Sequence, residues 1–146
     1  MPFESNEDMP RRGSLRLVVD TNVLISSLLS VGMMALLRHV VKHHTLLFSA
    51  TQLDEFKRVV IRPKLKGRIL PQHQEELLEA LEHDGSLVDV VSKVVVCRDP
   101  DDDHLLAMCK DGSADILITG DEDLLVLKKF GKTRIQSPAE FLRNHP

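Results

Sequence analysis

Apolar residues along the chain fall into two alternating patterns. Short apolar runs of strand length stand at residues 15–19, 45–50, 87–97, 115–119 and 133–136. Between these runs, apolar residues recur at helical spacing in the stretches 22–43, 51–60, 72–83, 104–111, 124–130 and 138–142. Strands that alternate with helices are typical of a parallel sheet covered on both faces. The pattern therefore predicts a three-layer α/β/α sandwich with a mostly parallel central sheet.

Several helix boundaries are marked by residues that favour capping. Thr51 followed by Asp54 resembles a capping box for the helix after the second strand. Ser137 followed by Glu140 resembles another, with proline at the first helical position. Gly131 stands where a C-terminal glycine would end the preceding helix. We therefore expect helices to begin or end at these residues.

One domain accounts for the length of the chain. Residues 15–146 contain all the predicted strands and helices, whereas residues 1–14 mix charges with proline and glycine and are expected to form a flexible N-terminal tail. No run of 18 apolar residues occurs, so no membrane-spanning helix is expected. The two cysteines, Cys97 and Cys109, fit no zinc or disulfide spacing, which favours a reducing, cytoplasmic location.

The overall charge argues against a protein that coats nucleic acid by bulk electrostatics. The formal net charge is −3 at pH 7, a value that still allows a local basic surface. The chain has no Trp or Tyr and five Phe, so stacking on bases cannot be a main source of affinity. Any contact with nucleic acid would therefore run through phosphates.

Acidic residues gather where ligands bind in α/β sheets. They stand at the ends of two strands and near the starts of two helices: Asp20, Asp121, Asp123, Glu55 and Asp103. These places converge on the carboxyl edge of a parallel sheet, and the sequence offers no obvious Lys or Arg to pair the acids. Clustered carboxylates repel unless a hard divalent ion joins them, which indicates one or two Mg²⁺ or Mn²⁺ ions. Such ions polarise a phosphodiester and activate water for in-line attack.

The acids allow three other interpretations. The aspartates of residues 99–103 imitate the start of a calcium loop, but His104 and Lys110 stand where glycine and glutamate are needed. A phospho-acceptor signalling domain would need an acidic pair after the first strand, where the sequence has a single acid. In a binding module without catalysis, Asp102 and Asp121 would only cap helices.

Four motifs together resemble the PIN-domain nucleases, most of all the branch described as toxins of prokaryotic toxin–antitoxin systems. Each motif alone would be weak, but the four occur in the family's order and at plausible spacings. The resemblance covers the chain from residue 15 to residue 142. The motifs are Leu17-Val-Val-Asp20-Thr21-Asn22-Val23-Leu24, Glu55, Arg98-Asp-Pro-Asp-Asp-Asp103-His-Leu-Leu-Ala107 and Ile118-Thr-Gly-Asp121-Glu-Asp123-Leu124.

The resemblance implies a set of site residues within a PIN-like nuclease domain. The family's catalytic and metal-binding acids match Asp20, Glu55, Asp103 and Asp121, with Asp123 as a further metal ligand. Asp103 is preferred because the family's acid stands immediately before a small apolar helix. Asp102 is the rival by one position, and Asp101 also remains open. Asn22 and Thr119 resemble polar residues that orient the acids, although turn capping and a strand-end hydroxyl would explain them equally well.

The activity implied by the resemblance is metal-dependent hydrolysis of RNA phosphodiester bonds, leaving a 5′-phosphate and a 3′-hydroxyl. Mg²⁺ or Mn²⁺ would be the cofactor, and His104 is expected beside the site without acting as the base. The implied partners are the RNA substrate, a cognate antitoxin protein and a second copy in a homodimer. The alternatives are a metal- or nucleic-acid-binding module without turnover and a PIN-type nuclease that acts in RNA processing or on DNA.

A basic segment follows the helix that carries Glu55. Six Lys or Arg residues fall within twelve positions and no acid stands among them: Lys57, Arg58, Arg62, Lys64, Lys66 and Arg68. Backbone phosphates are the usual partners of such a segment, so we expect it to contact RNA. The alternative is a solvated helix end and linker.

Overall fold

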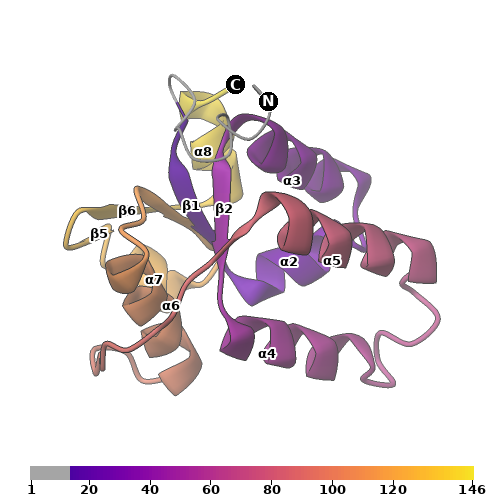
Figure 1. The fold of residues 1–146 in the computed structure, drawn as a ribbon, viewed down its shortest axis with the longest axis horizontal. Helices are drawn as coiled ribbons and strands as arrows, with labels where there is room; N and C mark the ends of the chain where they lie inside the picture. Colours follow the sequence, from indigo (N-terminus) through magenta and orange to yellow (C-terminus); the bar gives the residue numbers. More distant parts are fainter. Residues whose placement is uncertain (1–13) are drawn as a thin grey trace.

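The computed structural model describes residues 14–146, which form a six-stranded sheet covered by helices on both faces (Figure 1). In the sheet the strands follow the order β3-β2-β1-β4-β6-β5, and all neighbours are parallel except the pair of β5 and β6. The predicted α/β/α sandwich is therefore confirmed. The predicted N-terminal tail lies outside the described residues, apart from Ser14. The strands are β1 (Arg16–Val19), β2 (Thr45–Phe48), β3 (Ser86–Leu87), β4 (Ile116–Ile118), β5 (Lys129–Phe130) and β6 (Thr133–Gln136).

Helices divide between the two faces of the sheet according to the residues that they bury. The larger core cluster includes buried residues of α2, α3, α4, α5 and α8, and the smaller one includes those of α6 and α7. Figure 1 shows α6 and α7 on one side of β1 and β2 and the helices α2 to α5 on the other. The helices are α2 (Thr21–Ser27), α3 (Val31–His43), α4 (Ala50–Val60), α5 (Pro71–Asp84), α6 (Pro100–Asp111), α7 (Glu122–Leu125) and α8 (Pro138–Asn144).

The central strand β1 alternates its side chains between these two cores. Leu17 and Val19 belong to the larger cluster, whereas Val18 belongs to the smaller one, and all three are almost fully buried. A strand buried on both faces has no place for polar side chains along its length. The first polar residue, Asp20, therefore falls at the carboxyl edge of the sheet, where the backbone leaves β1 for α2.

Three local predictions are corrected by the structure. Helix α4 is capped by Ser49, whose hydroxyl accepts from Gln52 N–H, so Thr51 lies within the helix. Gly131 has φ +57° and lies between β5 and β6, because α7 has already ended at Leu125. The run 87–97 contributes only its first residue to the paired strand β3, and the remainder extends without strand pairing. The predicted cap at Ser137 is confirmed.

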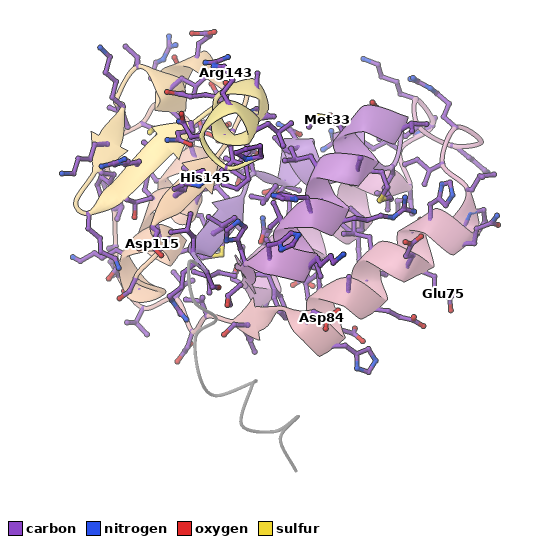
Figure 2. All side chains as sticks on the ribbon, turned by 90° about the horizontal axis from the view of Figure 1, so that it is seen from above. Met33, Glu75, Asp84, Asp115, Arg143 and His145 are labelled. Atoms are coloured by element: carbon purple, nitrogen blue, oxygen red, sulfur yellow. The ribbon has the colours of Figure 1, made fainter. Side chains whose placement is uncertain are left out.

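A groove of about 840 Å³ lies between α3 and α5. Figure 2 shows these two helices side by side, with Met33 on α3 and both Glu75 and Asp84 on α5. Apolar residues of both helices, including Leu37 and Leu77, line the groove, and none of the acids at the carboxyl edge does so. The acidic residues therefore lie outside this groove.

No single helix within residues 14–146 is long and apolar enough to cross a membrane. Helices α2 and α3 reach the necessary length and composition only together, and they are bent by 116° relative to each other.

Candidate active site at the carboxyl edge of the sheet

Asp20 is fixed in place at the end of β1 by two hydrogen bonds. Its Oδ1 accepts from the backbone N–H of Asn22 at 3.0 Å, which caps α2. Its Oδ2 accepts from Thr119 Oγ1 at 2.7 Å. Burial raises the pKa of Asp20 above the usual value, although these hydrogen bonds act in the opposite direction. Asp20 is therefore a buried, oriented carboxylate, and no basic side chain within residues 14–146 is bonded to it.

Thr119 connects the ends of the two central strands. It follows β4, the neighbour of β1, and its side chain is fully buried. Its hydroxyl donates to Asp20 and accepts from the backbone N–H of Asp121 at 3.0 Å. A single buried hydroxyl thus sets the position of one acid directly and of a second acid through its backbone. Asn22 contributes its backbone N–H, while its side chain is exposed.

Three aspartates form a close acidic cluster beside Asp20. Asp102, Asp121 and Asp123 each offer a carboxylate oxygen within 4.8 Å of the others. Burial raises the pKa of Asp102 to about 7, and the charge of Asp121 and a hydrogen bond between the two carboxyls act in the same direction. Asp121 also caps α7 by accepting from the backbone N–H of Asp123. The three carboxylates are therefore close enough to repel one another when they are ionised.

Asp102 and Asp103 point in different directions although they are adjacent in α6. Asp103 Oδ1 accepts from the backbone N–H groups of Val96 and Cys97, at 3.0 and 2.7 Å, and these bonds lower the pKa of Asp103. Successive helical residues are rotated by about 100°, so a shift of one position moves the carboxylate to another face. The structure therefore brings Asp102 to the acidic cluster, in the place for which the sequence favoured Asp103.

The same helix start disfavours the calcium-loop interpretation. Asp99 is the N-cap of α6, and its Oδ1 accepts from the backbone N–H of Asp101. With Asp103 bonded to the preceding segment, the alternate aspartates of this run do not gather around one point. Asp101 is exposed, and its charge raises the pKa of Glu55.

Glu55 approaches the site from α4, one of the helices on the larger core face. Burial raises the pKa of Glu55, and the charges of Asp101 and Asp20 raise it further, while the Thr21 hydroxyl lowers it. The side chain is partly exposed. Glu55 lies on the second turn of α4, which begins directly after the carboxyl end of β2, and it is outside the close cluster of three aspartates.

The sequence analysis did not predict a buried polar network that lies next to the site. Gln52 Nε2 donates to the carbonyl of Val19 at 2.7 Å, and Ser49 Oγ lies 2.9 Å from His104 Nε2. Gln52 is 3% exposed. The network ties the start of α4 to β1 and α6. One signal in the sequence could have revealed it, a glutamine at a helix position that should be apolar. His104 lies beside the site, as expected, and bonds to a capping residue.

One basic residue does pair with the acidic cluster, contrary to the expectation that none would. Arg98 Nη2 lies 2.7 Å from Asp123 Oδ1. The Arg98 side chain is 86% exposed, so the ion pair stands at the solvent side of the cluster and contributes little stability. Asp20 and Asp102, which are buried, have no Lys or Arg hydrogen-bonded to them within residues 14–146.

The six basic residues of the segment 57–68 are all exposed. They lie on the last turn of α4 and on the connection to α5, which Figure 1 shows beyond the ends of both helices. Because α4 begins at the site edge and spans about 16 Å, these residues lie roughly one helix length from the acids. The sequence and the structure thus place a basic surface near the acidic edge but separate from it.

Comparisons with known proteins agree with this fold. A family model described as PIN domain matches residues 16–123. Among solved structures, "Crystal structure of VapBC2 from Rickettsia felis bound to a DNA fragment from their promoter" contains a similar chain, with a TM-score of 0.56 and 13% identity over 84% of this chain and 98% of that one. At this identity the likeness concerns the fold alone. No curated protein matches. Because the family model covers most of the chain and the acids stand at the sheet edge, this protein belongs to the PIN domain family.

Proposed function

We propose that this protein is a metal-dependent endoribonuclease and the toxin of a toxin–antitoxin pair. The observation that carries the proposal is the group of carboxylates at the carboxyl edge of the sheet, above all the buried Asp20 and Asp102, to which no Lys or Arg of residues 14–146 is hydrogen-bonded. Nucleases that use divalent ions need such a group. The family to which the chain belongs supports the nuclease class.

The donor set fits Mg²⁺ or Mn²⁺. All the groups that converge are carboxylates, and hard cations of this size prefer oxygen ligands. Asp102, Asp121 and Asp123 would hold the ion, with Asp20 and Glu55 completing the set from β1 and α4. When bound, the ion would polarise the phosphodiester and lower the pKa of an attacking water. It would also relieve the repulsion that raises the pKa of Asp102.

The chain's own residues would do three things in the reaction. Thr119 and the Asn22 backbone hold the Asp20 carboxylate in one orientation, so no reorganisation is needed when the substrate arrives. Glu55 has a raised pKa and is partly exposed. Its carboxylate would therefore accept a proton at the solvent-facing side of the site. Asp102 would lose its proton before the ion binds, because its neutral form cannot serve as a charged ligand.

RNA as the substrate, and the antitoxin as the partner, rest on the resemblance of the sequence to toxins of toxin–antitoxin systems. The similarity of the fold to a chain of the VapBC2 complex supports the same setting. The exposed basic segment 57–68 would hold the substrate backbone. A homodimer would lengthen this basic surface.

The decisive experiment measures cleavage of a mixed-sequence single-stranded RNA in Mn²⁺ and in EDTA. We expect cleavage in Mn²⁺ alone, and its loss in both Asp20→Asn and Asp102→Asn. Asp54→Asn is the matched control, because Asp54 is an exposed acid adjacent to Glu55. Single-stranded and flap DNA are assayed in parallel. Cleavage of DNA alone would replace RNA as the substrate, and metal binding without cleavage of either would favour the binding module.

The basic surface is tested by charge reversal at two of its exposed residues. Lys64→Glu with Lys66→Glu should weaken RNA binding and reduce the slope of log affinity against log salt by about 0.7 for each phosphate that is no longer neutralised. Lys110→Glu with Lys129→Glu is the control, because both lysines are exposed and lie outside the segment. Equal salt slopes in the two double variants would show that another surface binds the RNA backbone.

A further inference from the structure

Residues 88–97, which we call the strap, connect β3 to α6 as an extended chain with regular alternation. Val90 and Val94 pack against the smaller core, whereas Val91 and Val95 are 75% and 91% exposed. Lys93, between them, is also exposed. Figure 1 shows this connection as a long segment without helix between α5 and α6. The strap therefore has the side-chain pattern of a strand, with one face toward the core and one toward solvent.

The backbone of the strap is largely unpaired. Within residues 14–146, the N–H groups of Lys93, Val94 and Val95 have no hydrogen-bond partner. No carbonyl of residues 89–97 accepts a hydrogen bond from the same part of the chain. Extended backbone with free donors and acceptors and exposed β-branched side chains is the template to which another strand adds.

Two aspartates of α6 hold the backbone of the strap at two points. Asp111 accepts from the backbone N–H groups of Val91 and Ser92, at 2.7 and 2.8 Å. Asp103 accepts from the two N–H groups at the other end, those of residues 96 and 97. Residues 93–95, whose N–H groups are unpaired, lie between the backbone groups that Asp111 and Asp103 bind. A partner strand would therefore meet a preformed edge and would not have to order it.

We propose that the strap is a docking edge for an extended segment of a partner protein, in which an acidic residue lies between two apolar residues at alternate positions. The apolar residues would cover Val91 and Val95, and the acid would face Lys93. Charge disfavours a second copy of this chain, because antiparallel pairing centred on the strap would set Lys93 opposite Lys93. The inference stands on the strap alone and does not depend on the nuclease activity.

The test uses a heptapeptide of alternating threonine and valine with glutamate at its centre, labelled for fluorescence anisotropy. Hydrogen exchange of the full chain is measured alongside. We expect binding at micromolar to millimolar peptide, with new protection of the Lys93 and Val95 amides, whose N–H groups point to the same side of an extended chain, and no new protection of the Val94 amide, which points to the opposite side. A peptide with lysine at the centre should bind about fivefold more weakly. Lys93→Glu should reverse this preference, and Lys110→Glu, which is exposed on α6, should leave it unchanged.

Three outcomes would overturn the proposal. The first is that the glutamate peptide fails to bind, or binds the Lys93→Glu variant equally well. The second is that the Lys93 and Val95 amides are already protected in the free full chain, since the strap would then be paired without a partner. The third is that the free protein dimerises through the strap, as shown by a dimer that Val95→Lys converts to a monomer.

Discussion

The two edges of the sheet each gather ionisable side chains of one kind, acids at the carboxyl edge and histidines at the amino edge. At the amino edge, His44 Nδ1 accepts from the backbone N–H of Leu15 at 3.0 Å, and His39 Nε2 lies 3.1 Å from the carbonyl of His145. Figure 2 shows His145 beside α8 in the view onto this edge. The rings of His39 and His43 are 4.6 Å apart. Four histidines thus crowd into one contact group.

Burial shifts the pKa of one residue at each edge, His44 and Asp102, toward the neutral form, with different consequences. Burial and the neighbouring histidines lower the pKa of His44, so this ring is neutral at pH 7 and can accept its hydrogen bond. Burial and the neighbouring acids raise the pKa of Asp102 only to about 7, so its cluster still carries repelling charge. The amino edge needs no ligand, whereas the carboxyl edge is suited to a cation.

The largest expected effect separates the two neighbours in α6. Asp102→Asn should reduce Mn²⁺-dependent cleavage by more than about 100-fold, because loss of a ligand exceeds the 10–100-fold cost of losing a residue that orients one. Asp103→Asn should lower the melting temperature, because two backbone N–H groups lose a charged acceptor, while activity per folded molecule is retained. Cleavage rates and thermal unfolding in EDTA distinguish the variants. An inactive but stable Asp103→Asn would restore Asp103 as the ligand.

A second prediction concerns the hydroxyl that orients Asp20. Thr119→Val should weaken Mn²⁺ binding by about tenfold, since Asp20 loses its donor and Asp121 N–H loses its acceptor. Thr133→Val is matched, because Thr133 is also a buried threonine and donates to the carbonyl of Ala114 away from the acids. Calorimetric titration should find normal affinity in the Thr133 variant. Equal affinities in both variants would reduce Thr119 to a structural role.

A third prediction follows from the raised pKa of Asp102. The folded state keeps its proton up to about pH 7, whereas an unfolded aspartate loses it near pH 4, so this group lowers stability as pH rises from about 4 to 7. In EDTA, Asp102→Asn should therefore gain stability relative to the native protein between pH 5 and pH 8. Mn²⁺ affinity of the native protein should rise up to about tenfold per pH unit below pH 7 and then level off. A pH-independent stability difference would contradict the shift.

The smallest expected effect lies at the amino edge and has the opposite sign. Because the pKa of His44 is lowered, its contribution to stability is present above about pH 6.5 and is lost as pH falls below that value. His44→Asn keeps an acceptor for Leu15 N–H and takes up no proton. The melting temperature of the variant minus that of the native protein should therefore be higher at pH 5 than at pH 7. His73→Asn, on α5, is the control variant, and the gain of His44→Asn should exceed whatever change this control shows.

Much of the fold follows from the sequence because its causes are local. Strand-length apolar runs predicted β1, β2, β4 and β6, and the abrupt change from Val19 to Asp20 predicted an acid at the sheet edge. A buried parallel strand excludes polar side chains, so its end is visible in the sequence. Ser49 and Thr51 show the limit of this reasoning. Either hydroxyl could cap α4, and the end of β2 one residue before Ser49 decided between them.

Other features depended on contacts between distant segments. The choice between Asp102 and Asp103 required the phase of α6, which is set by its cap at Asp99, and the backbone that Asp103 contacts. The strap has the composition of a strand but lies beyond any neighbour with which it could pair within residues 14–146. The Arg98 pair with Asp123 joins residues 25 positions apart. Composition and periodicity determined which elements form and where the acids fall, because those depend on neighbours along the chain. Tertiary structure alone decided which carboxylates meet, because one helical residue turns a side chain by about 100°.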